Sequence, residues 1–390
     1  MGSIYFDYAN ACPVDLRVLE AMGEYHSTRF GNPSSLHGVG FEAAKSVRGA
    51  REQVASLIGA GDPQEIIFTS GATEANNLAL TGYSSMNRRK GTRIITTSIE
   101  HMSVMNPCKY LEKQGFEVVY LPVDRDGLID LRRLEEEITK ETILVSIMYA
   151  NGEIGTIQPI EEIGKITRGK GVALHVDATA ACGKISISVA DENIDMLTIS
   201  SNDMYGPKGV GALYVRRGTR VEPVLLGGGQ ERGYRSGSEN VPGIVGMGKA
   251  AEIAKEEMVD EGARLIVLRD KLISKISSEI PGSHLNGHPT RRLPNNVNFR
   301  FDYIEGESLI LSLDMIGVAA SSSSACTSKT LEPSHVLIAL GIPHGEAQGS
   351  LLLTLGKNNT EEDVDYLLRE LPGIVRRLRE MSPLTPKGGQ

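Results

Sequence analysis

The chain has 390 residues, which is enough for two domains with sizeable buried cores. Its 41 basic and 49 acidic side chains give a formal charge of −8, and this acidic balance argues against a nucleic-acid partner. The hydrophobic share of 40% is ordinary for a globular protein, and no apolar run reaches the length of a membrane span. The first residues lack the layout of a signal peptide, so we expect a cytoplasmic protein with no membrane contact.

Short apolar runs rich in β-branched residues alternate with helical patterns from about residue 64 onward. This alternation predicts βα units that build a mostly parallel, seven-stranded sheet. Before it, residues 41–58 have apolar side chains at helical spacing and end at a glycine, a typical helix C-cap. The predicted strands are 65–68, 93–97, 117–121, 143–149, 173–176, 196–200 and 211–215, with helices between them such as 74–80 and 160–167.

The pattern changes near residue 260, where a long charged helical stretch is followed by a loop rich in Pro, Gly, His and Asn. We predict a large α/β domain over residues 13–258 and a smaller α+β domain formed by residues 1–12 with 259–390. The smaller domain carries a serine-rich segment, 319–330, which we expect to be a mobile loop because small polar residues cannot pack a core. Its predicted elements are helix 250–278, loop 281–294, strand 295–301, helix 306–316, strand 350–355 and helix 360–379.

Four cysteines are widely scattered, at positions 12, 108, 182 and 326. The absence of any Cys-x-x-Cys pair argues against a disulfide framework and against a self-contained zinc site. Cys12, Cys108 and Cys182 lie in contexts typical of regular elements, and we expect them to be small buried residues. Cys326 differs, because it lies in the serine-rich segment.

The run Ser70-Gly71-Ala72-Thr73-Glu74 follows a predicted strand and opens a helix. Glycine allows close approach of the backbone, the helix start offers free N–H groups, and Thr73 adds a hydroxyl. These features suit a phosphate. A plain N-capping turn has the same appearance, so this motif by itself leaves both interpretations open.

Polar side chains follow other predicted strands in the same way. Asp177 ends one strand, His101 follows a second after Glu100, and Asn151 follows a third. A buried aspartate needs a partner, because an unpaired charge is costly to bury. A single histidine at a strand end is more often structural. The order Thr73, His101, Asp177 is nevertheless a specific combination.

These motifs resemble those of the NifS/IscS-type cysteine desulfurases, pyridoxal-phosphate (PLP) enzymes of fold type I. The resemblance runs from Tyr5-Phe6-Asp7-Tyr8 through Gly31-Asn32-Pro33-Ser34-Ser35 to Met381-Ser382-Pro383-Leu384, nearly the full length. It implies a PLP-dependent transferase fold with a large α/β domain and a smaller α+β domain. It also implies a homodimer in which Ser238 reaches the phosphate of the neighbouring subunit.

The resemblance assigns roles to the polar residues at the strand ends. Asp177 would pair with the protonated pyridine nitrogen, His101 would stack on the ring and act in catalysis, and Asn151 would contact the ring oxygen. The cofactor-binding residues that it implies are Ala72, Thr73, His101, Asn151, Asp177, Ser200, Asn202 and Ser238.

Four positions depart from the family pattern. In the segment from Ser200 to Tyr214, Asp203 stands where the resemblance places the Schiff-base lysine, and Asn202 replaces the adjacent histidine. Ala180 replaces a glutamine that contacts the cofactor, and Leu352 replaces an arginine that clamps the substrate carboxylate. A carboxylate cannot form a Schiff base, which needs an amine. Lys208 is a poor substitute, because ordinary members carry that lysine as well.

The segment Ser321-Ser322-Ser323-Ser324-Ala325-Cys326-Thr327-Ser328-Lys329 matches the family loop whose cysteine accepts sulfur as a persulfide. An exposed cysteine with no role is the alternative. If the substrate machinery is lost, the thiol of Cys326 could serve as a ligand of a [2Fe-2S]-type cluster, because such clusters take thiolate ligands. The cluster would be shared with an IscU-like scaffold protein, the family's usual partner.

Three functional readings follow. The first is a homodimeric IscS-like protein of iron–sulfur cluster assembly, with Cys326 as sulfur acceptor or cluster ligand and with impaired PLP-dependent desulfuration. The second is an active cysteine desulfurase that converts L-cysteine to L-alanine and a Cys326 persulfide with non-covalently bound PLP. The third, a PLP enzyme of other specificity, would explain Leu352 but not Asp203.

Overall fold

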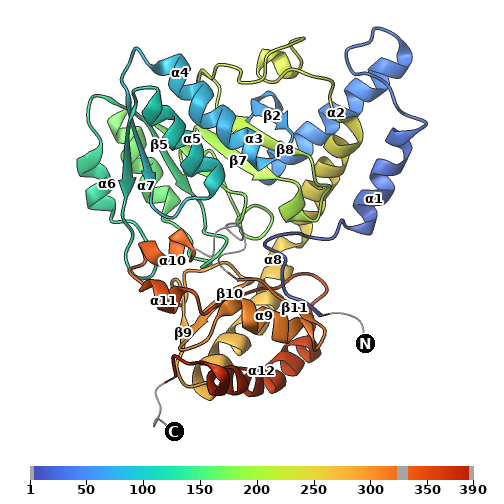
Figure 1. Cartoon of the computed structure of the whole chain (residues 1–390). Coiled ribbons are helices and arrows are strands. Elements are labelled where there is room, and N and C mark those ends of the chain that lie inside the picture. The colour runs from blue at the N-terminus through green and yellow to red at the C-terminus, as the bar shows by residue number, and fades with distance from the viewer. Residues whose placement is uncertain (1–3, 323–332, 386–390) are drawn as a thin grey trace.

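The computed structural model of the chain describes residues 4–322 and 333–385. Its largest sheet has seven strands in the order β2-β8-β7-β6-β5-β3-β4, and β8 alone runs antiparallel to its neighbours (Figure 1). The predicted mostly parallel, seven-stranded sheet is therefore confirmed. The strands are β2 (Ile66–Thr69), β3 (Arg93–Thr97), β4 (Glu117–Leu121), β5 (Thr142–Met148), β6 (Ala173–Asp177), β7 (Met196–Ser200) and β8 (Gly211–Val215).

Helices cover both faces of this sheet, which explains why its strands are apolar throughout. In β2, Ile66 and Phe68 belong to one apolar cluster, whereas Ile67 belongs to the cluster on the opposite face. The first cluster includes α2 (Gly38–Leu57), α6 (Leu131–Glu137), α7 (Ile160–Lys170) and the first half of α8 (Val241–Glu279). The second includes α3 (Ala72–Asn77), α4 (Tyr83–Asn87) and α5 (Met102–Lys113).

The long helix α8 connects this layered sheet to a separate apolar core. Leu265, Leu272 and Ile276 in its second half pack with an antiparallel sheet of order β12-β10-β9. The other elements around this core are β9 (Ser283–Leu285), β10 (Asn296–Phe301), β12 (Ser350–Thr354), α9 (Gly306–Asp314) and α12 (Glu361–Met381). Because α8 crosses residue 258 without a break, the domain boundary at that position stays a prediction.

The N-terminal residues lie against the second core. β1 (Ile4–Tyr5) pairs in parallel with β11 (Val318–Ala319), and Phe6 is fully buried among the residues of that core. Downstream, α1 (Leu16–Gly23) packs on α8, so the N-terminal segment contacts both parts of the molecule. Among the described residues, no helix is long and apolar enough to cross a bilayer.

Some expected elements differ from the observed ones. The predicted loop 281–294 contains β9, and α8 begins at Val241, because the side chain of Asn240 caps it by accepting from the Gly243 N–H. The predicted helix 74–80 is the middle of a longer helical rod, in which α3 continues through a π-helical turn (Leu78–Gly82) into α4. The helices α10 (His335–Ala339) and α11 (His344–Ala347) were not predicted.

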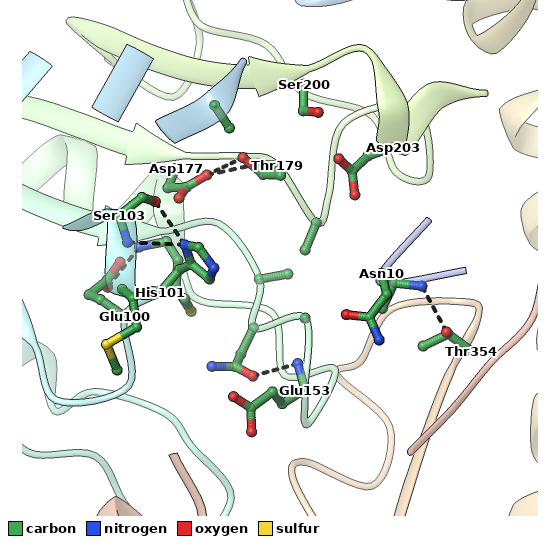
Figure 2. A pocket seen from close by; sticks show the side chains of 18 of the residues that line it. Asn10, Glu100, His101, Ser103, Glu153, Asp177, Thr179, Ser200, Asp203 and Thr354 are labelled. Atoms are coloured by element: carbon green, nitrogen blue, oxygen red, sulfur yellow. Dashed lines mark hydrogen bonds between the residues drawn. The ribbon is translucent and has the colours of Figure 1, made fainter. Parts of the chain in front are cut away.

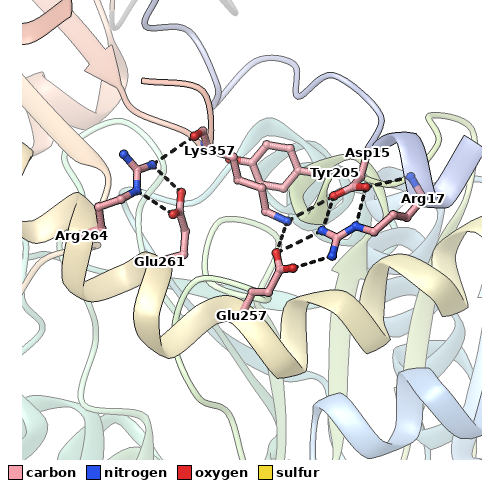
Figure 3. A network of polar contacts seen from close by, with 7 residues as sticks. All are labelled: Asp15, Arg17, Tyr205, Glu257, Glu261, Arg264 and Lys357. Atoms are coloured by element: carbon pink, nitrogen blue, oxygen red, sulfur yellow. Dashed lines mark hydrogen bonds and ion pairs between the residues drawn. The ribbon is translucent and has the colours of Figure 1, made fainter. Parts of the chain in front are cut away.

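An ion-pair network holds the N-terminal segment, α8 and the loop after β12 together (Figure 3). The Arg17 guanidinium contacts Asp15 at 2.7 Å and Glu257 at 2.6 Å, and the Lys357 ammonium contacts the same two carboxylates at 3.4 and 2.8 Å. Lys357 also lies over the ring of Tyr205 at 4.9 Å. This network therefore joins segments that belong to both apolar cores.

Candidate functional site

A cavity of about 470 Å³ lies at the carboxyl ends of the parallel strands, bordered by β12 and the N-terminal segment (Figure 2). Ligands of open α/β sheets bind at this edge, because several strand ends and loops converge there. The volume suits a small organic cofactor or substrate. The cavity is therefore the candidate functional site.

Asp177, the last residue of β6, contributes a firmly held carboxylate. Its Oδ1 accepts from the backbone N–H and the hydroxyl of Thr179 at 3.0 and 2.6 Å, and its Oδ2 accepts from Asn76 Nδ2 at 2.7 Å. These donors are neutral, so they orient the carboxylate without neutralising its charge. Asp177 can therefore pair with a cationic group of a ligand in the cavity.

His101 is the N-cap of α5, and Figure 2 shows its ring turned into the cavity. Its Nδ1 accepts from the backbone N–H of Ser103 at 3.1 Å and lies 2.8 Å from the Ser103 hydroxyl. Asn76 Nδ2 donates to that hydroxyl at 2.8 Å, which leaves the hydroxyl proton for His101. The neutral ring therefore carries its proton on Nε2.

Asn151 follows β5 and holds the next turn of the cavity wall. Its Oδ1 accepts from the backbone N–H groups of Glu153 and Ile154 at 2.9 and 3.0 Å, and its Nδ2 donates to Ile99 O at 2.9 Å. The second amide proton of Asn151 is the polar group that remains for a ligand oxygen. Glu153 also lines the cavity, and its Oε2 accepts from the Ser334 hydroxyl at 2.5 Å.

The turn Ser70–Thr73 forms another wall of the cavity. Gly71 has a φ of +152°, and the first residue of β8, Gly211, lies so close that an added Cβ would be 2.7 Å from the Gly71 carbonyl carbon. The Ser70 N–H donates to Glu74 Oε2 at 2.8 Å, and Glu74 pairs with Arg235 at 2.9 Å. Burial opposes ionisation of Glu74, but these bonds outweigh it and lower its pKa.

Asp203 lies in a short 3₁₀ helix (Asn202–Met204) directly after β7, and Figure 2 shows its carboxylate beside the cavity. The residue is 8% exposed. Burial raises the pKa of Asp203, while the positive charge of Lys184 and the polar side chains of Ser200 and Asn202 act in the opposite direction. Position 203 thus offers an acid and no amine.

The structure brings together most residues that the sequence singled out. Ser238 is exposed and is not part of the described lining of the cavity in one chain, and Cys326 lies outside the described residues. Lys208 donates to the carbonyl of Cys12 at 3.3 Å instead of lining the cavity. The predicted residues that line it are Ala72, Thr73, His101, Asn151, Asp177, Ser200, Asn202 and Asp203, with the substituted positions Ala180 and Leu352.

Sequence reasoning did not assign site roles to four ionisable residues of the lining, which are Glu74, Glu100, Glu153 and Lys184. Glu100 is fully buried, its Oε1 accepts from Thr97 and Met148, and its Oε2 has no partner. Burial raises the pKa of Glu100 to about 8. Lys184 donates to Ala180 O at 3.1 Å and Asp203 O at 3.5 Å. An acidic residue directly after an apolar strand was the available signal for Glu100, whereas nothing local marked Lys184.

The lining can be tested against the cofactor that the resemblance implies. Asp177 suits a protonated ring nitrogen, and the remaining amide proton of Asn151 suits a ring oxygen. An aldehyde needs an amine for covalent capture, and residue 203 has none. The described lining thus fits PLP as a ligand held by polar contacts, and it does not fit attachment at residue 203.

Comparison with known proteins places these features in a family. Residues 4–367 match the model of the Aminotransferase class-V family. The chain is 61% identical to "Cysteine desulfurase IscS 1" of Archaeoglobus fulgidus, covering 97% of this chain and 99% of the relative. It is 52% identical to "Cysteine desulfurase IscS" of Methanosarcina thermophila, covering 99% and 95%.

A solved structure agrees with the sequence relatives. The structure described as "NIFS-LIKE PROTEIN" superimposes with a TM-score of 0.90 at 41% identity and covers 96% of this chain and 100% of that one. Both the fold and the sequence therefore support the same assignment. The chain belongs to the class-V aminotransferase family, among its IscS/NifS-type cysteine desulfurases, whose cofactor is PLP.

Proposed function

We propose that this protein acts in iron–sulfur cluster assembly as a homodimer bound to an IscU-like scaffold, with little PLP-dependent desulfuration of its own. Cys326 is the sulfur acceptor or a cluster ligand in this proposal. Iron–sulfur clusters are commonly held by four ligands, most often cysteine thiolates. A scaffold that presents three cysteines would take its fourth ligand from Cys326, and sulfide would then enter the cluster without a change of oxidation state. If Cys326 is instead the sulfur acceptor, the other donor must supply sulfane sulfur.

One observation carries the proposal. A carboxylate, Asp203, stands in the cavity where the family resemblance places the lysine, while Asp177 and His101 keep the arrangement expected around a pyridine ring. Leu352 lines the same cavity and offers no charge to a substrate carboxylate. These two substitutions would therefore remove the amine that binds the cofactor covalently and the cation that binds the substrate carboxylate.

Exposed apolar side chains support the proposed homodimer. Leu36 is 89% exposed, Phe30 69% and Phe41 60%, and Leu226 in a distant segment is 80% exposed. Large apolar residues at such exposure favour burial against another chain. The family resemblance makes a second copy the expected partner and Ser238 a residue that acts across the interface. Light scattering during size exclusion should give twice the chain mass of 42.1 kDa.

A second function has its own support, because the cavity keeps polar groups that suit an unattached cofactor. In that reading the protein is an active cysteine desulfurase that uses non-covalent PLP and forms L-alanine and a persulfide on Cys326. Asp177 would hold the ring nitrogen, and the Nε2–H of His101 would face the reacting groups. PLP supplies the electron sink for that chemistry when it is bound.

The two proposed functions can be distinguished by the source of the sulfur that each one uses. We expect the protein, purified without oxygen together with the scaffold, to assemble a cluster from ferric iron and sulfide, as read from the visible spectrum. Cys326→Ser should abolish the shared cluster, whereas Cys108→Ala, at a buried cysteine, should retain it. Rapid sulfide release from L-cysteine by the wild-type protein, with reductant and PLP present, would establish the second function instead.

Restoring the two missing groups tests the reasoning about the cavity. Asp203→Lys should create covalent PLP binding, visible as an absorbance that borohydride removes, but cysteine turnover should stay low. Adding Leu352→Arg should raise kcat/KM about tenfold or more, because a charge-assisted contact to the substrate carboxylate contributes about 1.5–3 kcal/mol. Full turnover from the single variant would show that the arginine is dispensable.

A further inference from the structure

Carboxyl side chains outnumber ammonium groups in the described lining of the cavity. Among the described lining residues, Lys184 contributes an ammonium group and five other residues contribute carboxyl side chains. Of these, Glu74 is paired with Arg235 outside the lining, so it carries little excess charge into the cavity. An ammonium group of a ligand would therefore meet carboxyl groups as hydrogen-bond partners in this lining. The carboxyl residues are Glu74, Glu100, Glu153, Asp177 and Asp203.

Among these carboxyls, Asp203 and Asp177 come from neighbouring strand ends of the sheet. Asp177 is the last residue of β6, and Asp203 follows β7, which pairs with β6. Asp177 is already oriented by neutral donors. Lys184 contributes positive charge near Asp203, but its ammonium donates to the backbone carbonyls of Ala180 and Asp203. Among the described residues, the Asp203 carboxylate has polar neighbours in Ser200 and Asn202 but no ion pair, so a cationic donor from a ligand would be its first charged partner.

The length of the side chain at position 203 determines where a ligand nitrogen must lie to bond with it. In the family, a lysine nitrogen at this position bonds to the aldehyde carbon of PLP. An aspartate is shorter than an extended lysine by about the length of one N–H···O hydrogen bond, about 3 Å. An aminomethyl group on the ring places its own nitrogen where the lysine nitrogen would be. The Asp203 carboxylate would then meet that nitrogen at hydrogen-bonding distance.

We propose that Asp203 makes the cavity selective for the amine form of the cofactor, pyridoxamine phosphate, whose ammonium pairs with Asp203 while its ring nitrogen pairs with Asp177. The inference rests on the proposed cofactor cavity and deepens it by naming the ligand. A lysine at this position would bind an aldehyde covalently, whereas the carboxylate of Asp203 would bind an amine through an ion pair.

Calorimetric titration of the full-length protein, freed of vitamin B6, tests the selectivity. Pyridoxamine phosphate is compared with pyridoxine phosphate, which differs only by a neutral hydroxyl in place of the amine and cannot form an imine. We expect the amine to bind about tenfold more tightly or better, because a charge-assisted hydrogen bond contributes about 1.5–3 kcal/mol. Equal affinities in the wild-type protein, or no binding of either compound, would overturn the proposal.

Variants assign the preference to Asp203. Asp203→Asn keeps the shape and should reduce the preference to about threefold or less, while pyridoxine phosphate binding, which reports on the rest of the cavity, stays within a few fold. Asp203→Lys should reverse the preference by repelling the ammonium. Lys208→Gln, outside the lining, is the matched control and should change neither affinity. An unchanged preference in Asp203→Asn would contradict the role of this carboxylate. The Cys326 experiments use no vitamin B6 comparison, so the proposed function stands or falls separately.

Discussion

At the scale of single residues, burial decides the charge state of the cavity wall. Glu100 and Glu153 are both carboxyls whose pKa burial raises, to about 8 and about 7, and His175 is a buried imidazole whose pKa burial lowers to about 4. His175 is held neutral between the hydroxyls of Ser146 and Thr198 at 2.8 and 3.1 Å. Burial therefore favours the neutral forms of these three groups.

Glu100 predicts a pH-dependent stability difference. Unfolded Glu100 ionises near 4.5, whereas folded Glu100 stays protonated up to about 8, so its contribution to stability is full below pH 4.5 and is lost as pH rises toward 8. Glu100→Gln removes this titration. Relative to wild type, the variant should gain on the order of 4 kcal/mol in unfolding free energy between pH 4.5 and 8.

Urea denaturation of both proteins at the two ends of this range measures the gain. Glu112→Gln, at an exposed position of α5, is the control and should show no such trend. The unfolding free energies of wild type and variant could instead differ by the same amount at both pH values. That result would mean that Glu100 is ionised in the folded protein.

At the scale of elements, the cavity depends on close contact between β8 and the turn before α3. Gly211 begins β8, and an added Cβ would lie 2.7 and 2.8 Å from the backbone of Gly71. Two backbone segments cannot yield as a flexible side chain can. The approach therefore requires glycine at position 211, and it sets the position of the turn that carries Thr73.

Gly211→Ala should displace the Ser70–Thr73 turn. Overpacking of this kind costs about 1–3 kcal/mol, and we expect a matching loss of stability together with at least tenfold weaker binding of pyridoxine phosphate. Thermal denaturation and calorimetry report the two effects. Gly169→Ala on α7, where an added Cβ meets nothing within 4 Å, should be neutral or slightly stabilising. Unchanged ligand affinity in Gly211→Ala would show that the turn is not part of the binding site.

At the scale of the whole molecule, α8 and the ion-pair network around it hold the two apolar cores together. Glu257 on α8 contacts both Arg17 from the N-terminal segment and Lys357 from the loop after β12. Hydrogen bonds from these two cations lower the pKa of Glu257 to about 2. Its side chain is 38% exposed, so solvent screens the network substantially.

Glu257→Gln should therefore destabilise the protein by about 1 kcal/mol or less near neutral pH. Because the folded pKa is lowered, the contribution of Glu257 is present above its unfolded value of 4.5 and is lost as pH falls toward 2. Thermal denaturation in low salt and in about 1 M salt should show the difference shrinking as charges are screened. A difference that salt does not reduce would point to packing as its origin.

Much of the candidate site could be predicted because its residues follow strands in sequence. Thr73, His101, Asn151 and Asp177 each come directly after an apolar run, and the ends of parallel strands meet at one edge of a sheet. Local patterns also predicted all seven strands of the large sheet to within about one or two residues. Short elements such as β9 escaped prediction, because their signals are weaker than those of the turns around them.

The amino-acid sequence alone determined the fold class, the family and the loss of an amine at position 203, because these depend on local patterns and on residue identity. Only the tertiary structure decided that Lys184 reaches the backbone of Asp203, that Glu100 has an unpartnered oxygen in the wall, and that Leu352 closes the same cavity. Those relations join segments far apart in the chain. Their distances and burial follow from how strands and loops pack in three dimensions, which no local pattern encodes.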